Sequence, residues 1–275
     1  MSLDIKIKEL KDVSELEKLS LQSFSYSRLN TFDWCPAQYF FNYIVKYPQE
    51  YGAKALLGNV VHKALELTIR DEEGINTAEL LDNFRAAREE YDPDYTIIDD
   101  ELYALGIDML ENYVVRQAGA PSKITTAELG FEFVFAGVLF RGFIDKVLVT
   151  EAEVSILDYK SGKFEVSPKD VPSNLQLGIY ALYLKYLYPD KDITAGLYYL
   201  QSGKIKKHKF SDEDFEDLQV RLAEAVDQVR DTTNFLPTRA KWKCKICSYA
   251  KDGSCGTGRK VIKDSNPAIR YESEF

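Results

Sequence analysis

Two carboxylates and a lysine stand at the ends of apolar segments. Asp158-Tyr159-Lys160 closes the run Val154 to Leu157, and Asp145 follows Gly142-Phe143-Ile144 thirteen residues upstream. Side chains two positions apart on a strand share a face, so Asp158 and Lys160 should project together. Two carboxylates can hold a hard divalent cation, and the lysine can orient or activate an attacking water. The pattern predicts metal-dependent phosphodiester hydrolysis; the alternative is a solvated Asp–Lys ion pair at a strand end.

Three further residues strengthen this prediction by their order along the chain. His62 ends Gly58-Asn59-Val60-Val61-His62, in a segment suited to a buried helix. Gln176 and Tyr180 are spaced i, i+4 and would share one face of a helix that follows the lysine strand. Alone, His62 could be a hydrogen-bonded core histidine, and Tyr180 could serve packing. The order and spacing of all six positions is hard to obtain by chance.

The expected elements place helices first, a sheet in the middle and helices again. Ser27 is expected to cap a helix toward Tyr43 that Pro36 breaks or restarts. Further helices are expected at Gly58 to Arg70, Thr77 to Glu90, Asp100 to Gln117 and Leu175 to Tyr188, and from a cap at Ser211 toward Asn234. Strands are expected within Glu128 to Val149, with a turn at Gly137, and at Val154 to Lys160, Ile193 to Leu200 and Lys204 to Phe210. This order predicts an α/β fold, a central mixed β-sheet flanked by helices, in one domain over residues 1–275.

Charge and hydropathy limit the classes of protein. The 35 basic and 44 acidic side chains give a net charge of −9, which argues against a large nucleic-acid footprint. Basic residues nevertheless gather at Lys204 to Lys209 and from Lys241 to Lys263. The start, Met1-Ser2-Leu3-Asp4-Ile5-Lys6, has no signal-peptide pattern, and no apolar run is long enough to span a bilayer. We therefore expect a cytoplasmic protein with no membrane partner.

The four cysteines are placed asymmetrically: Cys35 near the start, and Cys244, Cys247 and Cys255 near the end. In an intracellular protein, Cys-x-x-Cys with a third cysteine nearby favours a metal site over a disulfide. Zinc and iron–sulfur clusters both use four thiolates, so the residues alone leave both open. Disulfides or unrelated free thiols are the alternative.

Taken together, these motifs resemble a PD-(D/E)XK nuclease of the RecB type, in the restriction-endonuclease-like superfamily. The match runs from Ser25 to Leu29 with Cys35-Pro36, through the motifs above, to the last cysteines. The resemblance implies a nuclease core at about residues 52–210. It also implies that His62, Asp145, Asp158 and the Tyr159 carbonyl approach Mg²⁺ or Mn²⁺, and that Lys160 acts on the water or the scissile phosphate. Gln176 and Tyr180 would contact the nucleic-acid backbone or brace the lysine, and Glu128 resembles a less regular acid of the family.

The cysteine arrangement resembles the iron–sulfur clasp of helicase–nuclease subunits and CRISPR-associated exonucleases. It implies a [4Fe–4S] cluster, favoured over zinc, that joins segments at about residues 25–45 and 236–260 into a terminal lobe. Seven residues separate Cys247 from Cys255, where five are usual in the family. The neighbouring lysines, with Trp242 and Tyr249, are candidates for a strand-binding face; the alternative is that they only keep the lobe soluble.

The resemblance therefore implies a DNA exonuclease acting on single strands or DNA ends in recombination, repair, CRISPR adaptation or phage DNA processing. A helicase, integrase or recombination protein is an expected partner, because the chain lacks a Gly-x-x-x-x-Gly-Lys-Ser/Thr loop. Two alternatives stay open. One is an iron–sulfur module that holds DNA ends for such a partner with little catalysis, and the other is a zinc-stapled RNA-processing nuclease.

Overall fold

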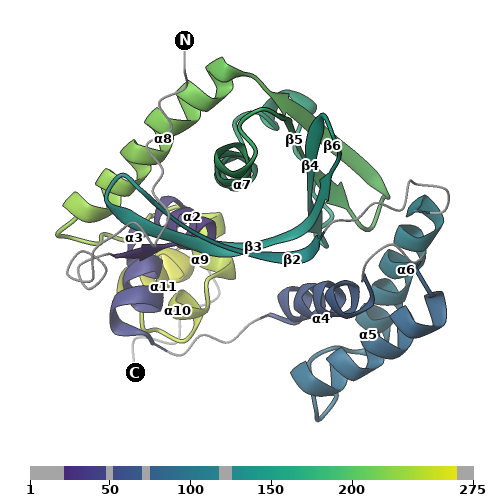
Figure 1. The fold of residues 1–275 in the computed structure, drawn as a ribbon. Helices are drawn as coiled ribbons and strands as arrows, with labels where there is room; N and C mark the ends of the chain where they lie inside the picture. The colour runs from purple at the N-terminus through teal and green to yellow at the C-terminus, as the bar shows by residue number, and fades with distance from the viewer. Residues whose placement is uncertain (1–21, 48–51, 70–74, 118–125, 265–275) are drawn as a thin grey trace, which may run out of the picture. The chain divides into compact units, whose positions relative to one another are not determined.

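The computed structural model describes residues 22–47, 52–69, 75–117 and 126–264. The chain divides into two compact units (Figure 1). Unit 1 is Met1–Ser23 with Tyr51–Ala223, and unit 2 is Phe24–Glu50 with Glu224–Phe275. Two predictions fall outside the described residues. One is that Met1 to Lys6 has no signal-peptide pattern, and the other is that a helix ends at Arg70.

Unit 1 is built on a six-stranded mixed sheet. Its order is β1-β3-β4-β5-β6, and β2 pairs with β3. The strands are β1 (Ser23–Phe24), β2 (Thr126–Phe135), β3 (Val138–Val149), β4 (Glu153–Lys160), β5 (Asp192–Tyr199) and β6 (Lys204–Phe210). The β2–β3, β3–β4 and β5–β6 pairs are antiparallel, whereas β4 and β5 are parallel. A parallel pair needs a crossover, and α7 (Leu175–Leu187) provides it.

The inner and outer strands differ in burial as their sequences predict. Every residue of β5 after Asp192 is buried, because helices cover both faces of this strand. β6 carries Lys204, Lys206, Lys207 and Lys209, charged side chains that suit an edge strand. The predicted α/β fold with a central mixed sheet flanked by helices is confirmed.

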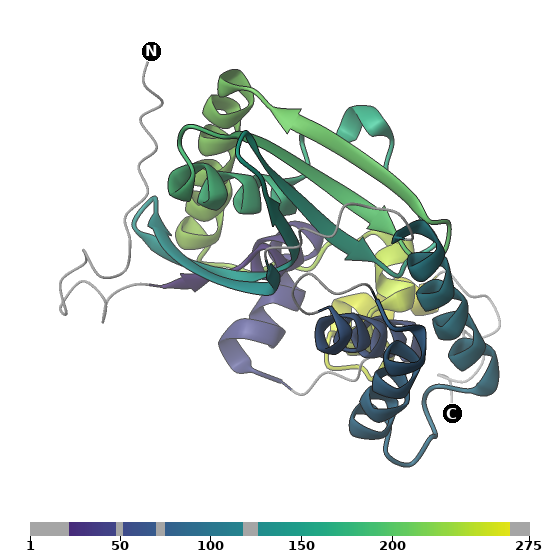
Figure 2. The ribbon, with the colours of Figure 1, turned by 45° about the vertical axis from the view of Figure 1, so that its right-hand side comes forward.

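One face of the sheet is covered by α7. Asn174 caps this helix, its Oδ1 accepting the amide of Leu177 (3.0 Å). The helix is apolar around most of its surface because it is enclosed, as Figures 1 and 2 show: the sheet curls around it. Gly178 has no side chain where Leu218 of α8 (Asp212–Asp231) packs, and a Cβ there would collide with that leucine.

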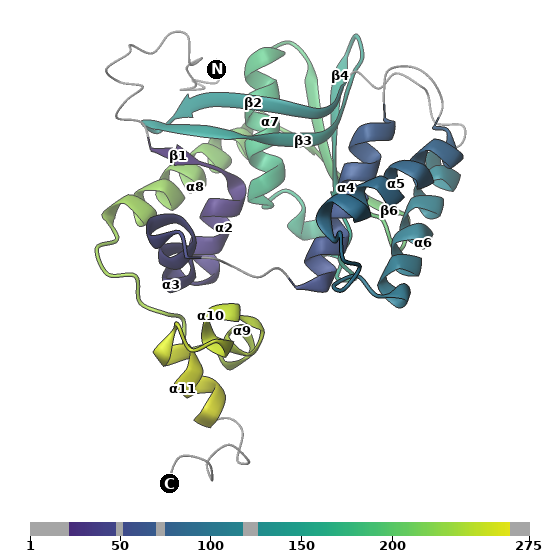
Figure 3. The same ribbon diagram turned by 90° about the horizontal axis from the view of Figure 1, so that it is seen from below.

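The other face is covered by α4 (Ala53–Thr68), α5 (Thr77–Tyr91) and α6 (Asp100–Gln117), which lie side by side in Figure 3. Val61, Leu65 and Thr68 of α4 are buried. Val61 and Leu65 pack in a cluster with helix residues such as Phe84 and with Tyr159 of β4. In the described part of the chain, no helix is long and apolar enough to cross a membrane.

Unit 2 consists of short helices. They are α2 (Tyr26–Trp34), α3 (Pro36–Tyr39), the π-helix η2 (Phe40–Val45), α9 (Lys241–Ile246), α10 (Ser248–Lys251) and α11 (Gly256–Asp264). Pro36 restarts the helix as predicted, because proline fits the first helical position. The prediction of Ser27 as the N-cap is wrong. The cap is Ser25, whose Oγ accepts the amide of Arg28 (3.2 Å), and Ser27 lies inside the first turn.

Candidate active site

Asp145 lies where β3 parts from β4. The ladder between these strands runs from Val149↔Val154 to Lys146↔Leu157, so Asp145 and Asp158 would form the next pair. Instead, the amide of Tyr159 donates to Asp145 Oδ2 at 2.6 Å. A carboxylate thus takes the place of a backbone partner, which separates the strands and fixes the Asp145 side chain.

Glu128 faces Asp145 from the opposite strand. The flanking pairs Ala127↔Lys146 and Leu129↔Ile144 put Glu128 directly across from Asp145, where the β2–β3 ladder is interrupted. Glu128 has φ 47°, a left-handed conformation that is costly for any residue other than glycine. Burial and the charge of Asp145 raise the pKa of Glu128 to about 7. Like charges across two strands destabilise a sheet. The arrangement therefore stores backbone strain and electrostatic repulsion, and a bound cation would relieve the repulsion.

His62 of α4 completes this cluster. Its Nδ1 is 3.6 Å from Asp145 Oδ1, and one ligand atom each from His62, Glu128 and Asp145 all lie within 4.8 Å of one another. Burial lowers the pKa of His62, but the hydrogen bond to Asp145 and the charges of Asp145 and Asp158 outweigh it and raise the pKa. An imidazole with two carboxylates is a donor set that suits a divalent cation such as Mn²⁺.

Asp158 supplies a third carboxylate and is 2% exposed. Its Oδ2 lies 2.7 Å from Lys160 Nζ, and apart from this ion pair it accepts no hydrogen bond from the residues that the structure describes. Burial raises the pKa of Asp158, and the charge of Lys160 opposes that shift. A buried carboxylate oxygen with open lone pairs beside Asp145 fits a second contact to a cation.

A hydrogen-bonded chain from α7 holds Lys160. Its Nζ donates to Gln176 Oε1 (2.7 Å), and Gln176 Nε2 donates to the Tyr180 hydroxyl (2.9 Å). Burial and the charge of Asp158 raise the pKa of Tyr180, so the phenol stays protonated. Of the two roles predicted for Gln176 and Tyr180, the geometry is that of bracing the lysine; contact with nucleic acid stays a prediction.

Residues 23–251 match the family model of the PD-(D/E)XK nuclease superfamily. The chain belongs to this superfamily. The match includes every residue of the clusters above, from His62 to Tyr180.

Individual relatives of this PD-(D/E)XK protein are distant. "Gene 69 protein" of Mycobacterium phage D29 is 27% identical over 160 residues, which are 54% of this chain and 57% of the relative. "Gene 69 protein" of Mycobacterium phage L5 is 33% identical over 125 residues, 44% of this chain and 41% of the relative. The matched segments thus span about half the length of these curated relatives. A crystal structure from Eubacterium rectale, named "Putative exonuclease", superimposes with TM-score 0.54 at 11% identity, covering 89% of this chain and 92% of its own. At that identity the likeness shows the fold alone.

The structure brings the predicted site residues of this superfamily member into two linked groups. His62, Glu128 and Asp145 form one, and Asp158, Lys160, Gln176 and Tyr180 form the other. The Tyr159 amide joins them through its bond to Asp145. The Tyr159 carbonyl as a metal ligand stays a prediction, as do the RecB-type and CRISPR-associated likenesses.

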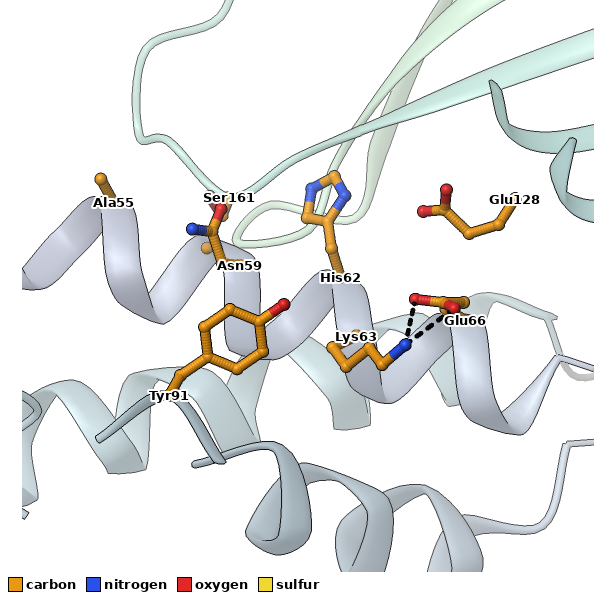
Figure 4. A pocket seen from close by; sticks show the side chains of 9 residues that line it. Ala55, Asn59, His62, Lys63, Glu66, Tyr91, Glu128 and Ser161 are labelled. Carbon is orange, nitrogen blue, oxygen red and sulfur yellow. Dashed lines mark hydrogen bonds and ion pairs between the residues drawn. The ribbon is translucent and has the colours of Figure 1, made fainter. Parts of the chain in front are cut away.

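A pocket of about 300 Å³ opens beside His62 and Glu128 (Figure 4). Its walls come from α4, the end of α5, β2 and the residue after β4. The lining residues are Ala55, Gly58, Asn59, His62, Lys63, Glu66, Tyr91, Glu128 and Ser161. The sequence motifs did not predict Asn59, Tyr91 or Ser161 as pocket residues. Asn59 and Ser161 could have been found as neighbours of Gly58 and Lys160, but Tyr91 ends an acidic helix and carries no motif.

All four cysteines lie in unit 2 and are free, so the disulfide alternative is not what the structure contains. Cys35 Sγ accepts the amide of Thr238 (3.4 Å) and Cys255 Sγ that of Gly258 (3.3 Å). Burial raises the pKa of Cys244, and the charges of the other three thiols raise it further.

The four thiols are not arranged around a single metal ion. Among the described residues, no three Sγ atoms lie within 4.8 Å of one another. Tetrahedral zinc with Zn–S bonds of about 2.3 Å would need them roughly 3.8 Å apart. The iron–sulfur lobe stays a prediction.

The predicted strand-binding face in unit 2 is wrong for one aromatic residue. Tyr249 is 1% exposed, and its hydroxyl donates to Asn42 Oδ1 (2.5 Å), so it cannot stack on a base. Lys243 is also engaged, because its Nζ donates to the Trp34 carbonyl (2.8 Å) and lies over the Trp34 ring. Trp242 remains 59% exposed.

Proposed function

We propose that this chain is a divalent-metal-dependent deoxyribonuclease that hydrolyses phosphodiester bonds as an exonuclease on single strands or DNA ends. The observation that carries the proposal is the position of Asp145. It stands between Glu128 and His62 on one side and the Asp158–Lys160 pair on the other. Superfamily membership supports phosphodiester chemistry for this arrangement.

Each residue of the site would have its own role in hydrolysis. His62, Glu128, Asp145 and Asp158 would hold Mg²⁺ or Mn²⁺, which when bound polarises the phosphate and stabilises developing negative charge. Lys160, held by Gln176, points its ammonium group at the Asp158 carboxylate and would orient the attacking water or the phosphate. Tyr180 fixes Gln176 in the orientation that accepts from the lysine. Because these contacts exist before substrate binds, little reorganisation is needed during reaction.

The support for a preference for DNA ends comes from related proteins and from charge. The Eubacterium rectale structure that shares this fold is named "Putative exonuclease", and the curated relatives are phage proteins. Residues 239–263 contain eight basic and one acidic side chain in a chain of net charge −9, which gives unit 2 a basic segment suited to phosphates. We propose phage DNA processing, recombination or repair as the setting, with a helicase, integrase or recombination protein as partner.

The cysteines support a resident cluster in unit 2. Four thiols in one unit, with amide donors on Cys35 and Cys255, are a chemically suitable donor set for [4Fe–4S]. We propose that this cluster joins the N-terminal segment of unit 2 to its C-terminal segment. Its contribution would be structural, since no thiol belongs to the catalytic cluster of unit 1.

The test uses linear and circular substrates. Purified protein is incubated with Mn²⁺ or EDTA and with end-labelled single-stranded DNA, duplex DNA, RNA of the same sequence, and circular single-stranded DNA. We expect Mn²⁺-dependent shortening of linear DNA, little attack on RNA, and intact circles because an exonuclease needs an end. Cut circles would replace the exonuclease with an endonuclease. Tight DNA binding without products under Mn²⁺ would instead favour a DNA-holding module.

A further inference from the structure

The pocket beside His62 has the dimensions and the walls of a small-ligand site rather than a channel for bare phosphate. Its volume of about 300 Å³ is at the lower end of the range for ligand pockets. It shares His62 and Glu128 with the proposed metal cluster, so whatever occupies it lies next to the bond that is cut. All of its lining residues belong to unit 1.

The lysine of this pocket is already paired. Lys63 is its one lysine or arginine, and Nζ lies 2.9 and 3.0 Å from the two carboxylate oxygens of Glu66. Figure 4 shows this pair on the α4 wall, with the carboxylate of Glu128 nearby. A phosphate in the pocket would find no unpaired lysine or arginine. The charge therefore favours a neutral group.

The remaining walls suit a nucleobase. The Tyr91 side chain, 37% exposed, gives an aromatic face, and the side chain of Ala55 adds apolar surface. Asn59 offers both a donor and an acceptor, and its side chain makes no hydrogen bond to the other described residues. Ser161 brings a hydroxyl from the position directly after Lys160. An aromatic plane with neutral hydrogen-bonding groups is how proteins bind unpaired bases.

We infer that this pocket is a nucleotide subsite: it binds the base of the nucleotide adjacent to the scissile phosphate, with Tyr91 stacking on the base and Asn59 at its edge. The inference rests on the proposed function and adds its substrate contact. A base can enter only when it is unpaired, so the subsite selects single strands or frayed ends. Tyr91 is a positioning residue here, since it touches the substrate away from the reacting atoms.

The test pairs a protein change with a substrate change. Wild type and Tyr91→Leu are compared on a single-stranded oligonucleotide and on versions with one abasic position moved along it. We expect wild type to lose on the order of tenfold in kcat/KM at one position, next to the cut bond. Tyr91→Leu should lose a similar factor on the intact strand and little more on that abasic strand, because the stacked pair is already broken. Tyr188→Leu, a tyrosine at the end of α7 that does not line the pocket, is the matched control.

Binding in EDTA separates this inference from the proposed function. Fluorescence anisotropy of the same oligonucleotides should show the same coupled loss without any cleavage. If wild type binds with that pattern yet never cuts, the nuclease proposal fails and the subsite stands. Equal binding and cutting by Tyr91→Leu and wild type would overturn the subsite. The subsite would also be overturned if the loss from Tyr91→Leu and the loss from the abasic position simply multiplied when the two changes are combined.

Discussion

Lys160 reaches the catalytic carboxylates with its ammonium group already oriented. The Gln176 carbonyl accepts from Nζ, and the Tyr180 hydroxyl holds the Gln176 amide, so three side chains fix one another. A lysine has several free rotations, and misplacing a reacting group by about 1 Å can cost on the order of 100-fold in rate. We therefore expect the contacts of Gln176 and Tyr180 to affect the rate of hydrolysis, although neither residue touches the reacting atoms.

Gln176→Leu tests the brace. The substitution keeps the helix and the volume but removes the acceptor, so Lys160 should lose its fixed position beside Asp158. We expect kcat on single-stranded DNA to fall about 10- to 100-fold while KM changes little. Steady-state kinetics in Mn²⁺ provide the measurement. Gln176→Glu, which restores an acceptor, should recover part of the loss, and a Gln176→Leu enzyme with wild-type kcat would contradict the bracing role.

Glu128 gives a second residue-scale prediction. Glu128→Gly removes both the φ 47° strain and the repulsion with Asp145, so without metal the variant should be more stable than wild type by about 1 kcal/mol. The same variant should lose most of the stabilisation that Mn²⁺ gives the wild type. Glu128→Gln removes the charge but keeps the strained backbone, so it should be less stable than the glycine variant. Thermal unfolding with and without Mn²⁺ checks all three, and equal midpoints in EDTA would contradict the strain.

Residue types and spacing predicted which residues lie close together better than they predicted how those residues are arranged. The sequence shows apolar strand runs before Asp145, Asp158 and Lys160. It also shows His62 shortly after Gly58. These patterns were enough to predict that the four residues lie close together. The role of Glu128 beside Asp145 could not be predicted from the sequence. Its left-handed conformation and its place opposite Asp145 depend on how β2 and β3 pair. Tyr91 could not be predicted as a pocket residue for a similar reason, because only the packing of α5 on α4 brings it to the pocket.

At the scale of elements, the loop after α5 is held by one buried carboxylate. Asp92 is 1% exposed and accepts the amides of Thr96, Ile97 and Ile98 at 2.8 to 3.2 Å. Burial raises the pKa of Asp92, but these bonds and the charge of Arg88 outweigh it and lower the pKa below 3.8. The loop joins α5 to α6, so it helps to fix the helix layer that carries Tyr91.

Asp92→Asn should weaken this loop in a pH-dependent way. Because the folded pKa is depressed, the charged form contributes stability at pH values above the unfolded value of 3.8. That contribution is lost as the pH falls below 3.8 through the folded pKa. We therefore expect the variant to be less stable than wild type by a constant margin from pH 7 to pH 5 and by a smaller margin at pH 3.5. Urea unfolding at the three pH values measures the margin. A margin that grows toward acid would contradict the sign.

The elements themselves were largely predictable, since periodicity and caps mark them. α7 is enclosed and apolar and ends before Pro189, and the β5–β6 hairpin turns at Ser202-Gly203 as its sequence indicates. The error at Ser25 and Ser27 arises because two serines stand within one turn and either can cap. The arrangement of α4, α5 and α6 on one face could not be predicted, because it depends on packing against Tyr159 and Tyr198.

At the scale of the whole molecule, the four cysteines belong to unit 2, whereas the candidate metal ligands His62, Glu128 and Asp145 belong to unit 1. We proposed a cluster on the cysteines. Protein purified without oxygen should contain about four iron atoms per chain and little zinc. Cys247→Ser should lose most of that iron and lower the unfolding temperature, because the N- and C-terminal segments of unit 2 would lose their shared ligand. Elemental analysis of both proteins decides this, and one zinc per chain would contradict the cluster.

The most direct test of the account is single-turnover cleavage of end-labelled single-stranded DNA in Mn²⁺ by wild type, Asp158→Asn and Lys160→Met. Lys169→Met, an exposed lysine outside both clusters, is the control. If Asp145, Asp158 and Lys160 form the hydrolytic centre, the first two variants should be folded, bind DNA, and cut at least 100-fold more slowly than wild type. Lys169→Met should cut at the wild-type rate. Cleavage at the wild-type rate by folded Asp158→Asn or Lys160→Met would contradict the central claim.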